Sequence, residues 1–269
     1  MRTIFRLLIV IIFLLCGMQA FGNDKLPEEF PAMGSALCDK PSDFNEAGCK
    51  VCPKFMAEGS EGPSNRKGGL GIYSVVSGSF TSAGKTEALL LGFGSCFSHA
   101  EGNASAFLLR KEQGSWHRLS FFHNDGPAGL CQKIPGQGDK RDLIICNYED
   151  YGAGAISVIG FDVNGKVKTN STLVQTWTFP FRSDEKQKHC SSLQANMKKI
   201  SFNSIEISVF PNSFDADPPI ICDDESNGTT SKISNSKKFG AIAVFIRNGN
   251  NFAPDEATKK LLSEVAKSR

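Results

Sequence analysis

The cysteines are the residues of this 269-residue chain with the clearest capacity for chemistry. Eight of the nine follow an N-terminal segment that has the features of an export signal, and outside the cytosol no thiol pool would keep them reduced. Their even number predicts disulfide bonds rather than free thiols. The eight are Cys38, Cys49, Cys52, Cys96, Cys131, Cys146, Cys190 and Cys222.

The spacing of these cysteines leaves their pairing open, because eight cysteines can combine in many ways. One bond is expected between Cys131 and Cys146, since they lie on consecutive predicted strands that should be antiparallel neighbours. Cross-links of this kind would stabilise a chain that is rich in loops and contains 26 glycines.

Cys49 and Cys52 form a CxxC pair, whose thiols could also serve redox chemistry or bind zinc. A thioredoxin-like site needs a preceding strand and a helix start, but no apolar strand precedes the pair and Pro53 follows it directly. We therefore interpret both as structural disulfide cysteines, with the redox and zinc roles as alternatives.

Cys96 and His99 have a spacing that zinc sites also use. Oxidation of the cysteine in an exported protein would remove the thiolate ligand. Nearby, Gly94-Ser95-Cys96 lacks the second glycine of the Gly-x-Ser-x-Gly nucleophile elbow. The sequence therefore predicts no catalytic, metal or cofactor site, and a triad assembled in space around one of the four histidines is the alternative.

The first 22 residues have the parts of a secretory signal peptide. Arg2 and Arg6 lie before an apolar run over residues 7–15, and the small residue Gly22 suits a cleavage site. We expect the mature protein to begin at Asn23 and to be secreted or periplasmic.

Two forms of membrane attachment are considered and disfavoured. The apolar stretch near the N-terminus is shorter than the roughly 20 residues that cross a bilayer, and no later segment comes close. Acylation of Cys16 would give a lipoprotein, but the bulky Leu15 stands where lipoproteins have a small residue.

Charge excludes one class of partner. A signal that contains Arg2 and Arg6 leaves 28 basic side chains against 28 acidic ones. Nucleic-acid binding needs clustered Lys and Arg, so a neutral domain without such clusters is not expected to bind nucleic acid. The expected partner is an unidentified protein or carbohydrate.

Short apolar runs separated by turn residues indicate an all-β domain over residues 70–252. Residues 23–69, rich in Pro, Gly, Ser and charge, are expected to form an irregular Cys-rich N-terminal arm. The predicted strands cover residues 71–76, 87–92, 105–110, 115–122, 128–134, 142–148, 155–161, 166–178, 198–202, 204–210, 218–222, 229–234 and 240–246.

One helix is predicted at the C-terminus, over residues 253–269. Pro254 suits its first position, where a missing N–H costs nothing. Ala257, Leu261 and Val265 follow at four-residue spacing and form an apolar stripe that should dock on the β domain.

A degenerate repeat is visible in the β domain. Gly78 opens a loop that ends at Glu87, before an apolar run, and Gly136 opens a similar loop that ends at Asp142. Such a repeat predicts a propeller-like array of three or four short antiparallel sheets around one axis, with a β-sandwich or barrel as the alternative. The runs at 89–91 and 143–145 should occupy equivalent buried strands.

The turns between these strands are expected to be tight. Asn164-Gly165 and Asn248-Gly249 each lie between apolar runs, and both residues of such a pair can take positive φ.

The order Gly-x-Phe, Gly-Lys and acid-Leu over residues 78–89 resembles the FG-GAP and VCBS blade repeats of extracellular β-propellers. The resemblance implies a propeller blade, and those repeats usually bind calcium through acids in the opening loop. Here Ser79, Thr81 and Ala83 stand where such acids would be, so the calcium function is not carried over.

These observations favour an exported, non-enzymatic binding or interaction protein on a disulfide-bonded β scaffold. Rigid β scaffolds suit loops that recognise partners. The alternative is a secreted hydrolase that acts on polysaccharide or peptide through residues gathered from distant loops.

Overall fold

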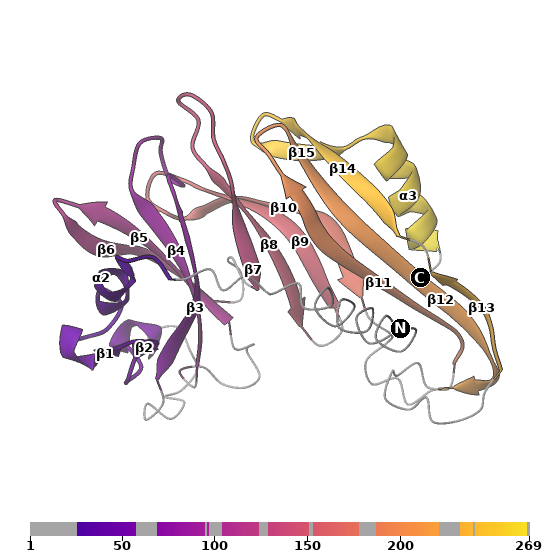
Figure 1. The fold of residues 1–269 in the computed structure, drawn as a ribbon, viewed down its shortest axis with the longest axis horizontal. Coiled ribbons are helices and arrows are strands. Elements are labelled where there is room, and N and C mark those ends of the chain that lie inside the picture. The colour runs from indigo at the N-terminus through magenta and orange to yellow at the C-terminus, as the bar shows by residue number, and fades with distance from the viewer. Residues whose placement is uncertain are drawn as a thin grey trace, which may run out of the picture.

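The computed structural model describes residues 26–57, 69–94, 96, 104–123, 129–150, 153–177, 187–220, 232–238 and 240–267. The predicted signal segment lies outside these ranges. Antiparallel strands dominate the described chain and form two sheets (Figure 1). The predicted all-β class is confirmed.

The first sheet has six strands in the order β1-β2-β3-β4-β5-β6, each antiparallel to its neighbour. They are β1 (Phe44–Asn45), β2 (Gly48–Cys49), β3 (Leu70–Gly78), β4 (Glu87–Gly94), β5 (Ala104–Glu112) and β6 (Ser115–His123).

The second sheet has nine strands, of which eight follow the order β15-β14-β12-β11-β10-β9-β8-β7 and one, β13, pairs with β12. They are β7 (Leu130–Ile134), β8 (Leu143–Asp150), β9 (Ala153–Phe161), β10 (Val167–Trp177), β11 (Gln187–Ile200), β12 (Ser204–Ile220), β13 (Lys232–Lys238), β14 (Ala241–Asn248) and β15 (Asn251–Pro254).

The strands group into three four-stranded meanders: β3 to β6 form the first, β7 to β10 the second, and β11, β12, β14 and β15 the third. Figure 1 shows them following one another in chain order. The second and third share a sheet, although among the described residues only the pair Trp177 and Leu193 joins β10 to β11 in the backbone ladder. The described strands form two sheets and not the predicted three or four separate sheets around one axis, and the row of meanders stays open.

The first two meanders share strand order but not hairpin geometry. In the first, Gln113 and Gly114 alone connect β5 to β6, with φ of 50° and 83°. In the second, five residues connect β9 to β10, and of these only Gly165 has a positive φ, 81°. The expectation that Asn164 also takes positive φ is wrong, because the Asp162 carboxylate accepts hydrogen bonds from the Asn164 and Lys166 N–H groups and closes a wider turn.

The runs at 89–91 and 143–145 lie on β4 and β8, in different sheets, and are buried as expected. All strands from β3 to β10 agree with the predicted ranges to within two residues at each end. Apolar runs alternate so regularly with turn residues in this region that short stretches of sequence suffice to predict its strands.

The long hairpin of β11 and β12 differs from the prediction. These strands pair from Ile200 and Ile205 outwards to Gln187 and Ile220, whereas the sequence predicted three shorter strands at 198–202, 204–210 and 218–222. Polar residues fill much of β11, so its strand form depends on pairing with β12 rather than on local propensity.

The C-terminal helix is present as α3 (Glu256–Lys267). It begins three residues after the predicted start at 253, because the Asp255 carboxylate accepts the Thr258 N–H at 2.8 Å and acts as the N-cap. Leu261 and Val265 pack against the core of the second sheet, but Ala257 is exposed and the buried Thr258 takes its place in the stripe.

Residues of the N-terminal arm cover one face of the first sheet. The arm contains α2 (Phe30–Ser35) and the 3₁₀ turns η1 (Pro41–Asp43) and η2 (Lys54–Ala57). Its buried residues share one apolar cluster with those of β3, β4, β5 and β6: Phe30, Met33, Leu37, Cys49 and Met56 from the arm, and Leu70, Ile72, Ala88, Leu90, Phe107, Leu109 and Trp116 from the sheet.

Two further clusters fill the space between meanders. One joins the first meander to the second through buried residues that include Leu89, Leu108, Ile144 and Ile159. The other joins the second to the third and to α3. Its buried members include Ile145, Val158, Ile207, Phe245 and Val265.

Three disulfide bonds cross-link the described chain. The expected bond between Cys131 and Cys146 joins β7 to β8. Cys38 bonds to Cys49 within the arm, and Cys52 bonds to Cys96, which ties the arm to the segment after β4. Cys190 is also disulfide-bonded, and Cys222 lies outside the described residues. These bonds fit a protein that is exported to an oxidising compartment.

A search of the described helices for membrane spans found none that is long and apolar enough to cross a bilayer.

Candidate functional site

The most concentrated polar cluster of the described chain lies where the first two meanders meet. Glu87, the first residue of β4, lies opposite Arg110 of β5 in the strand register. The Glu87 side chain is 0% exposed, and its Oε1 lies 2.9 Å from Arg110 Nε. A buried ion pair needs further hydrogen bonds to offset the loss of water.

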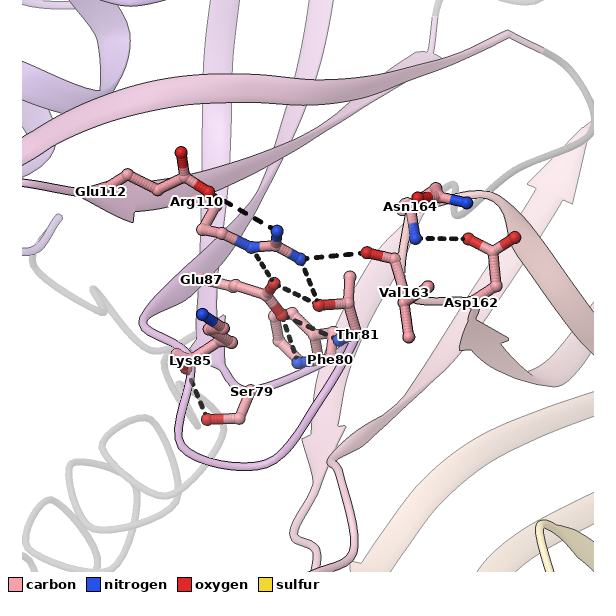
Figure 2. Close-up of polar contacts among 10 residues, drawn as sticks. All are labelled: Ser79, Phe80, Thr81, Lys85, Glu87, Arg110, Glu112, Asp162, Val163 and Asn164. Carbon is pink, nitrogen blue, oxygen red and sulfur yellow. Dashed lines mark hydrogen bonds and ion pairs between the residues drawn. The ribbon is translucent and has the colours of Figure 1, made fainter.

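Those hydrogen bonds come from the loop between β3 and β4. Glu87 Oε2 accepts the N–H groups of Phe80 and Thr81 at 2.6 and 2.8 Å, and Oε1 accepts the Thr81 hydroxyl at 2.5 Å (Figure 2). With Arg110 Nε, the carboxylate has four donors, which fills the acceptor sites of an ionised carboxyl. The carboxylate is therefore committed to holding this loop and Arg110.

Arg110 extends the cluster to the second meander. Its Nη2 donates to the Thr81 hydroxyl at 2.5 Å and to the Val163 carbonyl at 3.3 Å, in the turn between β9 and β10 (Figure 2). Its Nη1 lies 3.6 Å from Glu112 Oε1. The guanidinium therefore fastens a turn of the second sheet to the first.

Asp142, the acid that ends the second loop, has a similar role. Its Oδ2 accepts the Ser79 N–H at 2.8 Å, its Oδ1 accepts the Gly136 N–H at 2.7 Å, and its own N–H donates to the Ser79 carbonyl. Gly78 is needed beside it, because a Cβ there would lie 2.8 Å from Asp142 Oδ2. The two loops are thus bound to each other through one carboxylate.

The two acids of the degenerate repeat therefore stabilise loops instead of presenting free oxygens. Backbone N–H groups occupy the positions around Glu87 and Asp142 that a cation would need. Across the described ranges, no group of three or more His, Cys, Asp or Glu side chains is placed to hold a metal ion.

Exposed apolar side chains gather elsewhere on the same pair of sheets. Tyr73 of β3, Phe93 of β4 and Leu130 of β7 are 39%, 53% and 53% exposed. The two ring centroids lie 6.1 Å apart, and the Tyr73 hydroxyl donates to the Gly129 carbonyl at 3.0 Å. We call these three residues the aromatic patch.

Contacts with the neighbouring backbone and a nearby disulfide bond hold the residues of the aromatic patch in place. Phe93 lies over Gly71 on the neighbouring strand, where a Cβ would come within 3.1 Å of its ring. Partial burial raises the pKa of Tyr73, so the phenol stays neutral and keeps donating to Gly129. The Cys131–Cys146 bond fixes β7 directly after Leu130.

The residues singled out from the sequence are placed as follows. The CxxC cysteines bond to different partners, Cys49 to Cys38 and Cys52 to Cys96, so they do not form a redox pair with each other. Because Cys96 is oxidised, it offers no thiolate to zinc. His99 lies outside the described residues.

Sequence reasoning did not find the aromatic patch. Both faces of β4 carry buried apolar residues, so the alternation of side chains gives no signal that Phe93 is exposed. Two aromatic residues on neighbouring strands were the available signal.

Comparisons with protein-family models, with curated proteins and with solved structures found no match for this chain. The resemblance to FG-GAP and VCBS blades stays a prediction that rests on residues 78–89.

Proposed function

We propose that this chain is an exported, non-enzymatic binding protein that contacts a partner protein through the aromatic patch. The observation that carries the proposal is the exposure of Tyr73 and Phe93, whose rings lie 6.1 Å apart, with the Tyr73 hydroxyl bonded to Gly129 next to the exposed Leu130 of the other sheet. Aromatic side chains are enriched where proteins bind one another, because they offer large contact area at low entropic cost.

A partner that covers the aromatic patch would gain binding free energy from the buried apolar surface. Full burial of a large apolar side chain contributes about 1.5–3 kcal/mol, so covering the half that is exposed contributes roughly 1 kcal/mol per residue. Because disulfides and the Glu87–Arg110 cluster hold the supporting strands, little ordering entropy opposes binding.

The hydrolase alternative has less support. Hydrolysis of a glycosidic bond needs two carboxyl groups free to exchange protons or attack carbon. Glu87 and Asp142, the acids of the best-ordered polar loops, are both engaged by backbone N–H groups.

Site-specific photocrosslinking tests the proposal. A photoreactive phenylalanine analogue is placed at position 93 of the exported, full-length chain, and at position 210 as a control with similar exposure on the third meander. We expect a discrete protein adduct from position 93 only, which disappears when Tyr73→Ser is added. Equal adducts from both positions, or none from position 93, would contradict the proposal.

Two further measurements separate the alternatives. Retention on immobilised polysaccharide that Tyr73→Ser abolishes would identify a carbohydrate partner in place of a protein. Release of reducing ends from polysaccharide, or of peptides from denatured protein, by the purified chain would favour the hydrolase.

A further inference from the structure

A second cluster of side chains lies where the second and third meanders meet, away from the aromatic patch. Lys140 belongs to the loop between β7 and β8, Phe202 to the turn between β11 and β12, and Arg247 to the end of β14. Arg247 Cζ lies 4.2 Å from the Phe202 ring centroid, and Lys140 Nζ lies 5.3 Å from the same centroid.

Two hydrogen bonds hold the Arg247 guanidinium in place and leave other N–H groups of it free to donate. Its Nε donates to the Gly249 carbonyl at 2.9 Å and its Nη1 to the Phe202 carbonyl at 3.3 Å. A second ring, Phe252, lies 5.8 Å from Cζ. A guanidinium has five N–H groups in a planar fork, so the Nη2 side remains available to a ligand.

Neither cation has an acidic partner among the described residues. Within the described chain, no carboxylate forms an ion pair with Lys140 or Arg247. Asp139 directly precedes Lys140 in the loop but forms no ion pair with it among the described residues, and Asp142 is already bound to the Ser79 and Gly136 N–H groups. Partial burial lowers the pKa of Arg247, which reflects a charge that has lost water without gaining a counterion.

Two positive charges beside one ring repel each other, and an anion between or beside them offsets that repulsion. The rings attract each cation through their π faces but do not neutralise it. A tetrahedral oxyanion matches the site best, because guanidinium binds its oxygens in pairs and an ammonium adds a point charge.

We propose that Lys140 and Arg247, oriented by Phe202, bind a phosphate group of a ligand outside the cytosol. The ligand bridges the second and third meanders, which the backbone ladder of the described chain joins only through Trp177 and Leu193. Binding therefore stabilises the junction between them. The site is independent of the aromatic patch, and substitutions in either should leave the other unchanged.

Titration with inorganic phosphate and with pyrophosphate, at constant ionic strength set by chloride, tests the site in the full-length protein. We expect both anions to bind in calorimetry and to raise the unfolding temperature. Lys140→Gln should weaken pyrophosphate binding about tenfold, the scale expected for one lost charged hydrogen bond. Lys133→Gln, an exposed lysine on β7, is the matched control and should bind as the unaltered chain does.

Two membrane preparations identify the source of the phosphate. Co-sedimentation with phosphatidylglycerol vesicles but not phosphatidylcholine vesicles, lost in Lys140→Gln, assigns the site to a lipid headgroup. Binding of the free anions without vesicle binding assigns it to a soluble phosphate. Equal pyrophosphate affinity in Lys140→Gln and Lys133→Gln, or an effect that chloride reproduces, overturns the proposal.

Discussion

In the first meander, β4 carries four consecutive apolar residues, at positions 88–91, and all four are 0% exposed. In the third meander, β12 alternates instead: Ile205, Ile207 and Val209 are 0% exposed, whereas the side chain of Phe210 on the other face is 42% exposed. On neighbouring β14, Ile242 and Ile246 also point away from the core, at 43% and 48% exposure.

The difference follows from what covers each sheet. The arm covers one face of the first meander and the second meander covers the other, so both faces of β4 can be apolar. The third meander contributes to one cluster only, on the face that it shares with the second meander and α3. A continuous apolar run therefore marks a strand between two layers, and alternation marks a strand with one layer.

The largest effect is expected at the ion pair that joins the first two meanders. Glu87→Ala would leave Arg110, with its side chain 13% exposed, without its buried partner. Breaking a buried pair on one side costs about 3–5 kcal/mol. Urea unfolding monitored by fluorescence measures the loss, and Glu112→Ala is the control because that carboxylate is 54% exposed and should change stability by less than about 1 kcal/mol. Equal losses would show that Glu87 is not the stabilising partner.

The stability costs of truncating one residue on β4, which is covered on both faces, and one on the open face of β14 can be compared directly. Leu90→Ala removes a fully buried side chain between arm and sheet and should cost about 2–5 kcal/mol. Ile242→Ala, on the open face of the third meander, should cost under about 1 kcal/mol. Chemical denaturation measures both, and a comparable cost for Ile242 would mean that its face is covered.

Release of the arm should have a somewhat smaller effect. Replacing both Cys52 and Cys96 by serine removes the bond between the arm and the first sheet, and removing such a bond costs about 2–4 kcal/mol. Limited proteolysis should then cut the arm before the sheets. If cleavage of the arm is no faster than in the unaltered protein, its apolar contacts alone hold it in place.

The smallest effect is expected from the cap of α3, on the third meander. Hydrogen bonds from the Thr258 backbone and side chain hold the pKa of Asp255 below its usual value of 3.8. The charged form is favoured in the folded protein, so its contribution is present above 3.8 and is lost as the pH falls through the lower, folded pKa. Asp255→Asn keeps an acceptor but removes this titration, so its unfolding temperature should fall less steeply in acid. Parallel curves for the two proteins would contradict the assignment.

Much of the first two meanders could be predicted from the sequence, because their strands are short apolar runs between turn residues. The extent of β11 could not, since its polar residues become a strand only through pairing with β12. The acids Glu87 and Asp142 stand out as the ends of similar loops, but their partners Arg110 and Ser79 come from other segments.

By itself, the sequence determined the all-β class, the positions of most strands, the bond between Cys131 and Cys146 and the C-terminal helix, because each depends on local periodicity or on neighbouring strands. Only the tertiary structure decided that the meanders form an open row of two sheets, that both repeat acids are engaged, and that the exposed Tyr73 and Phe93 rings lie together beside the start of β7. Those features depend on contacts between residues far apart in the chain, which no local pattern encodes.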